Sequence, residues 1–252
     1  CNLLPNAFCQ KPRDVAFVLH QTNQQGTHGA AYNFAQMKSF FVNLVNLFSV
    51  DTGAVRIGFV AFAHETNDWF NLVSYSTSAG IKAAINVTTY PGNNPNIAPG
   101  NNLGGALNFV NEKIFRTTGD RPVPEFPNIV IVLTDTFADT NPSDTDPIAA
   151  ANAIRASNDL VYVVGVGQTL NTTYLNLLAG GYQNTVYSAA YDGLDLFGND
   201  YYYYKEINSR VCTGFNPTAA PPPPTMCTCY NLTTNAPTTI APAVMTYDIA
   251  IL

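Results

Sequence analysis

Charged side chains are scarce in this sequence. Asp, Glu, Lys and Arg make up 11% of its 252 residues, against about a quarter in typical soluble domains. The net charge is −6 and no run of Lys or Arg occurs, so we expect no nucleic-acid partner. The polar surface must come largely from uncharged side chains, a composition that favours a secreted glycoprotein over an intracellular enzyme.

Long apolar runs are also missing. The runs at 129–133 and 160–164 are only as long as a strand, far short of the roughly 20 residues that span a membrane. We therefore predict no membrane span. No signal peptide opens the chain, so we expect a mature product or an excised region.

Cysteine is absent from the whole middle of the chain. The five cysteines lie near its two ends, at Cys1, Cys9, Cys212, Cys227 and Cys229. This placement predicts a disulfide that joins the two ends of one domain in an oxidising compartment. Because five is an odd number, one cysteine is left free or bonds another molecule. Three glycosylation sequons, which begin at Asn86, Asn171 and Asn231, also indicate secretion.

Patterns typical of catalysis are not found. The segment 165–170 begins like a dinucleotide fingerprint but lacks its third glycine, and no nucleophile elbow of the form Gly-x-Ser-x-Gly occurs. His64 and Glu65 are not followed by the second histidine of a zinc protease. With three histidines in all, none paired with an evident nucleophile, we predict that the protein is not an enzyme.

Strand-like and helix-like segments alternate along most of the chain. Buried strands read as continuous apolar runs and helices as apolar residues three and four positions apart. The predicted strands are 14–19, 55–62, 69–75, 128–133, 160–166 and 185–188. The predicted helices are 34–48, 78–86, 103–114, one that begins at Asp146 and Pro147, 171–179 and 194–211. This order predicts an α/β fold: a doubly wound, mostly parallel six-stranded sheet with helices on both faces.

The two ends of the chain differ from this domain. Residues 1–13 form a cysteine-containing segment, residues 14–212 the domain, and residues 213–246 a Pro- and Thr-rich linker that cannot pack a core. Residues 248–252 repeat the residue types of 14–18, which indicates either the first strand of a second copy of the domain or a chance match. We predict the second copy, beginning at about residue 247.

Five segments, in the right order, resemble the von Willebrand factor type A family. They are 14–24, 55–62, 100–107, 129–135 and 160–167. The resemblance implies a Rossmann-like sheet with ligands bound at the carboxyl ends of its central strands, in agreement with the general rule for open sheets. Cysteines that flank the domain are common in extracellular members, which makes Cys9 and Cys212 the candidates for such a bond. Cys1, Cys227 and Cys229 are then candidates for further pairing.

Family members commonly hold a divalent cation at the carboxyl ends of the central strands and use it to bind an acidic group of a partner. The positions that would supply its ligands are changed in this chain: they carry His20, Thr22, Gln24, Asn101 and Asp135. Mg²⁺ needs compact oxygen ligands, and only the last of these is a carboxylate. We therefore expect no metal and no other cofactor. We predict instead that His20 lies beside Asp135 and that its donor or positive charge replaces the cation.

Two functions follow from these observations. The first is a secreted, non-catalytic structural or matrix protein whose partners are copies of itself or other matrix proteins, with 248–252 available to add a strand to a neighbouring sheet. The alternative is a monomeric adhesion module that binds a ligand at the carboxyl ends of the central strands, around Thr22, Asn101 and Asp135.

Overall fold

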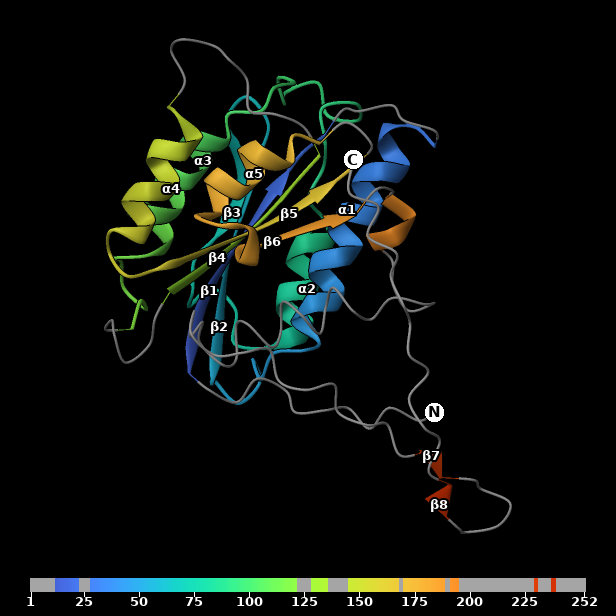
Figure 1. Cartoon of the computed structure of the whole chain (residues 1–252), viewed down its shortest axis with the longest axis vertical. Helices are drawn as coiled ribbons and strands as arrows, with labels where there is room; N and C mark the ends of the chain where they lie inside the picture. The colour runs from blue at the N-terminus through green and yellow to red at the C-terminus, as the bar shows by residue number, and fades with distance from the viewer. Residues whose placement is uncertain are drawn as a thin grey trace, which may run out of the picture. The chain divides into compact units, whose positions relative to one another are not determined.

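A six-stranded sheet organises the computed structural model of this chain (Figure 1). The strand order is β3-β2-β1-β4-β5-β6, and every neighbouring pair is parallel except β2 and β3. The strands are β1 (Arg13–His20), β2 (Val55–Phe62), β3 (Thr66–Phe70), β4 (Asn128–Thr134), β5 (Leu160–Val166) and β6 (Thr185–Ser188). The predicted fold class is confirmed.

The structure describes residues 12–22, 28–121, 128–135, 145–167, 170–188, 191–194, 229–230 and 237–238. The chain divides into two compact units, Ala7–Gly214 and a second one made of Cys1–Asn6 with Phe215–Leu252. In the second unit, the short strands β7 (Cys229–Tyr230) and β8 (Pro237–Thr238) pair antiparallel.

Helices cover both faces of the sheet. The α-helices are α1 (Ala30–Val45), α2 (Ser78–Asn86), α3 (Leu103–Phe109), α4 (Pro147–Arg155) and α5 (Thr172–Ala179). There are also a short π-helix, η1 (Val110–Ile114), and two short 3-10 helices, η2 (Tyr182–Asn184) and η3 (Tyr191–Leu194). In Figure 1, α1 and α2 lie on one side of the sheet and α3, α4 and α5 on the other. Each side has its own apolar core.

The two cores follow from the alternation of side chains along a strand. In β1, Val15, Phe17 and Leu19 belong to the core under α1 and α2, whereas Ala16 and Val18 belong to the core under the other three helices. Every residue of β1 is buried, which is why the strand reads as a continuous apolar run. The ring of Phe17 stacks on Phe41 of α1 with 4.5 Å between centroids.

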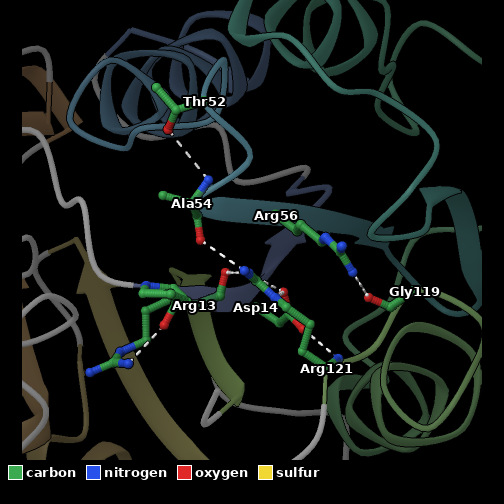
Figure 2. Close-up of polar contacts among 8 residues, drawn as sticks. Arg13, Asp14, Thr52, Ala54, Arg56, Gly119 and Arg121 are labelled. Carbon is green, nitrogen blue, oxygen red and sulfur yellow. Dashed lines mark hydrogen bonds and ion pairs between the residues drawn. The ribbon is translucent and has the colours of Figure 1, made fainter. Parts of the chain in front are cut away.

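A buried ion pair closes the amino end of the sheet (Figure 2). Asp14 of β1 is fully buried and accepts from Arg121 through the side-chain Nε at 2.8 Å and the backbone N–H at 2.7 Å. The same guanidinium donates to the carbonyl oxygens of Arg13 and Ala54. Arg121 therefore ties together the start of β1, the turn before β2 and the segment after η1.

Some element boundaries differ from those predicted. The third strand was predicted at 69–75 but lies at Thr66–Phe70, and a turn follows it in which the backbone N–H of Ser74 donates to Asn71 O at 3.2 Å. The helix predicted at 103–114 changes to a π-helix from Val110 onward. Asp146 caps α4 as predicted, with its side chain accepting from the N–H of Ile148. The helix predicted at 194–211 lies outside the described residues beyond its first position.

Candidate functional site

The candidate site lies where β1 and β4 end side by side. These neighbouring strands run parallel, with Leu19 opposite Leu133, so their carboxyl ends meet at one edge of the sheet. From β1 the chain continues outward to β2 and β3 on one side, and β4 continues to β5 and β6 on the other. Such a switch in strand order is where open α/β sheets form a binding crevice. We call this side of the domain the carboxyl edge.

His20, the last residue of β1, lies beside Asp135, which directly follows β4. The ring atom Nδ1 is 2.8 Å from Oδ1 of Asp135, and Nε2 is 3.0 Å from the carbonyl oxygen of Gly100. The ring also packs against Phe62, with 5.3 Å between centroids. Only 4% of the surface of His20 is exposed, so water does not compete for these contacts.

Both ring nitrogens of His20 lie against hydrogen-bond acceptors. A carbonyl oxygen only accepts hydrogen bonds, and an ionised carboxylate also only accepts. The ring therefore holds Asp135 and Gly100 together as a donor, and neither of its nitrogens faces the solvent.

Asp135 is held in its ionised form by its neighbours. Burial by itself would raise the pKa of this carboxyl group, but the hydrogen bond and charge of His20 and the hydrogen bonds from Thr22 and Tyr191 lower the pKa below its ordinary value. The hydroxyl of Tyr191 donates to Oδ2 at 2.5 Å. Burial and the nearby carboxylate raise the pKa of Tyr191, so it remains a donor.

The residues of the predicted site are brought together only in part. His20, Thr22 and Asp135 form one cluster, and Asn101 is buried next to Gly100, whose carbonyl oxygen contacts the cluster. Gln24 lies outside the described residues, as do Cys1, Cys9, Cys212, Cys227 and Asn231; Cys229 lies in β7, and its side chain is not described. Tyr191 was not among the predicted site residues. Its position after β6, which also ends at the carboxyl edge, was the available signal.

Hydrogen bonds within the chain already engage the side chains that would hold a divalent cation at this position. Both oxygens of Asp135 already accept hydrogen bonds, one from His20 and one from Tyr191. Both nitrogens of His20 face acceptors, so neither has a lone pair directed at a metal ion. Within the part of the chain that the structure describes, no group of three or more His, Cys, Asp or Glu side chains is placed to hold a metal.

A second polar network lies beside this cluster. Gln21 follows His20 and donates from Nε2 to Thr89 O at 2.7 Å and to Asp68 of β3 at 3.3 Å. Its Oε1 accepts from Asn67 at 2.7 Å. Burial raises the pKa of Asp68, although the hydrogen bond to Thr89 and the charge of Lys38 oppose this shift. The network fixes the loop that follows α2 against the end of β1.

The part of the chain that forms the sheet is similar to known proteins. Residues 14–196 match the model of the von Willebrand factor type A domain. The collagen alpha-6(VI) chain of Mus musculus is 29% identical over 188 residues, which are 74% of this chain and 8% of that protein. Matrilin-2 of Mus musculus is 28% identical over 161 residues, covering 63% of this chain and 15% of that protein. The chain thus spans only a small part of these relatives.

Solved structures show the same fold. Proximal thread matrix protein 1 from the mussel byssus superimposes with a TM-score of 0.67 at 22% identity, over 81% of this chain and 47% of that one. The mussel protein has also been solved with a zinc-occupied MIDAS motif, at a TM-score of 0.65 and 21% identity, over 81% of this chain and 46% of that one. No helix among the described residues of the present chain is long and apolar enough to cross a membrane.

Proposed function

Because the chain belongs to the von Willebrand factor type A domain family, we propose that it is a secreted, non-catalytic structural protein of an extracellular matrix. Its domain acts through protein–protein contacts that need no metal ion, including contacts between copies of the chain. The relatives that support this role are collagen chains, a matrilin and a thread matrix protein. The low charge, the sequons and the terminal cysteines support secretion.

The observation that carries the proposal is the contact between His20 and Asp135. The resemblance to the family implies that other members hold a cation at the position of His20 and use it to bind an acidic group of the partner. Here the ring of His20 takes this position, and both of its nitrogens are engaged by groups of the chain itself, Asp135 and Gly100. A buried ring whose two nitrogens are engaged has none left to offer a ligand. The carboxyl edge is therefore a structural part of the domain.

One observation favours the alternative, a monomeric adhesion module. The chain carries a net charge of −6, and like charge opposes the approach of identical copies. A module that binds a different, more basic matrix partner would not meet this repulsion. In that function, the ligand would contact the carboxyl edge around Thr22, Asn101 and Asp135.

The size of native, non-reduced particles separates these two functions. Mass photometry, with negative-stain images of the same sample, is expected to show multi-subunit or elongated particles. Adding EDTA is expected to leave the distribution unchanged, because no metal takes part in the contacts. A uniform monomer would contradict assembly and favour the adhesion module. Particles that dissociate in EDTA would contradict the metal-free contact.

A further inference from the structure

Two of the three sequons lie among the described residues, and both are found where a helix meets the carboxyl edge. Asn86 is the last residue of α2. Three residues later, the carbonyl oxygen of Thr89 accepts from Gln21, which directly follows the last residue of β1. Asn171 is the N-cap of α5, in the connection that leaves the carboxyl end of β5. Both asparagine residues are exposed.

These two positions lie on opposite faces of the sheet. α2 contributes Ile81 and Ile85 to the core that it shares with α1. α5 contributes Leu175 and Leu178 to the core that it shares with α3 and α4. Figure 1 shows α2 and α5 on the two sides of the sheet. Groups attached at the two asparagines would therefore flank the carboxyl edge from both sides.

The folded structure leaves the amide nitrogen of each asparagine available. Asn171 caps its helix through Oδ1, which accepts from the N–H of Tyr174 at 3.0 Å. Asn86 is bound through its backbone carbonyl, which accepts from Lys38 Nζ at 3.0 Å. N-glycosylation attaches the sugar at Nδ2 and leaves both of these acceptors in place. A glycan at either position is thus compatible with every hydrogen bond that these residues make in the described part of the chain.

One sequon contains an exposed apolar side chain, as expected if a glycan covers this part of the surface. Val87, the middle residue of the sequon at Asn86, is 77% exposed. The third residue, Thr88, is 3% exposed. If the glycan is attached before folding is complete, Val87 and Thr88 are both still accessible. The glycan then lies over Val87 in the folded domain.

We propose that Asn86 and Asn171 both carry N-linked oligosaccharides, which flank the carboxyl edge and keep protein partners away from it. The sugar donor is an oligosaccharide linked to a lipid pyrophosphate. A bond forms between the asparagine Nδ2 and the anomeric carbon of the sugar, the bond from that carbon to the pyrophosphate oxygen breaks, and the displaced pyrophosphate takes up the amide proton. This inference rests on the secretion and assembly proposed above, and it assigns the contacts between copies to other surfaces of the domain.

Occupancy is tested on the full chain secreted from cultured animal cells. Glycopeptide mapping is expected to find both asparagines modified, and Asn86→Gln and Thr173→Ala are each expected to remove one glycan from the intact mass. Thr173→Ala deletes the sequon but keeps the cap at Asn171. Thr172→Ala, an exposed neighbour that leaves the sequon intact, is the matched control and is expected to keep the glycan. A folded, secreted chain with either asparagine unmodified would overturn the proposal.

The position of the contacts is tested by adding a third glycan at the carboxyl edge. Pro95→Thr creates a sequon at Asn93, in the exposed loop between α2 and Gly100. Asn93 contacts the N–H of Tyr90 through Oδ1, so this contact survives glycosylation. Once mapping shows Asn93 modified, the particles are expected to keep their subunit number. Dissociation into monomers would show that partners do use this edge and would contradict the proposal.

The two proposals fail in different ways. A wild-type chain that is a uniform monomer contradicts the assembly function, whereas site occupancy can still be read on that monomer. A chain that assembles but leaves Asn86 or Asn171 unmodified contradicts only the glycan proposal.

Discussion

Nδ1 of His20 lies 2.8 Å from Oδ1 of Asp135, and this contact joins the ends of the two central strands of the sheet. Both side chains are buried. Burial of one charge is costly unless an opposite charge and hydrogen bonds accompany it. The two residues are therefore coupled: removing either one leaves the other buried without its main partner.

Replacing the histidine should destabilise the domain. His20→Ala leaves the carboxylate of Asp135 buried without its partner on β1, for which we expect a loss of about 3–5 kcal/mol in the free energy of unfolding. Urea denaturation measures the change. His64→Ala is the control, because His64 is only partly buried and its backbone N–H, not its ring, donates to the carbonyl oxygen of Ala98. Equal stability of the two variants would show that the pair does not stabilise the fold.

Arg121 should be as important at the opposite end of the sheet. Arg121→Ala removes the guanidinium that donates to the fully buried Asp14 and keeps only the hydrogen bond from the backbone N–H of residue 121. We expect a loss of about 3–5 kcal/mol, measured by the same denaturation experiment. Lys113→Ala, an exposed cation on η1, should change the stability by less than about 0.5 kcal/mol. A loss below about 1 kcal/mol for Arg121→Ala would contradict this role.

Asp159 should make the domain less stable as the pH rises. Burial raises the pKa of this carboxyl group from 3.8 to about 6, with hydrogen bonds from Asn128 opposing the shift. In the unfolded chain the group ionises near pH 4, whereas in the folded chain it keeps its proton to about pH 6. Unfolding therefore releases a proton between these values, and stability falls as the pH rises from about 4 to above 6.

Asp159→Asn should remove this effect. We expect the free energy of unfolding to rise by about 1–3 kcal/mol at pH 7.5 and to stay unchanged at pH 4. Thermal unfolding measured across the pH range checks both values. The added amide group also supplies a donor near Oδ1 of Asn128, which is buried without a partner in the described structure. Glu112→Gln, an exposed carboxylate on η1, is the control. A variant less stable than the wild type at pH 7.5 would show that the buried charge is compensated.

The central strands could be predicted from the sequence because both of their faces are buried. β2 and β5 begin and end where predicted, and so does β6, although it is an edge strand. β3 was placed too late because four of its five residues are partly or fully exposed, so the apolar pattern does not mark it. Asn71 and Ser74 then form a turn through local side-chain contacts, which no periodicity predicts.

The candidate site could be predicted only where its residues end buried strands. His20 and Asp135 could be paired because each ends a buried strand, and parallel strands bring their carboxyl ends together. Tyr191 and Gly100 reach the site through turns and loops. Their positions depend on the path of the backbone, which the residue types alone do not reveal.

The most direct test of the metal-free site is the melting temperature of the full chain in EDTA and in millimolar Mg²⁺, compared between the wild type and His20→Asp. A ligand that binds only the folded state raises its melting temperature. We predict no Mg²⁺-dependent change for the wild type. We predict a rise for His20→Asp, because that variant places two carboxylates and the hydroxyl of Thr22 around one position, a set of oxygen ligands that suits a hard cation. A rise for the wild type that His20→Ala abolishes would contradict the account.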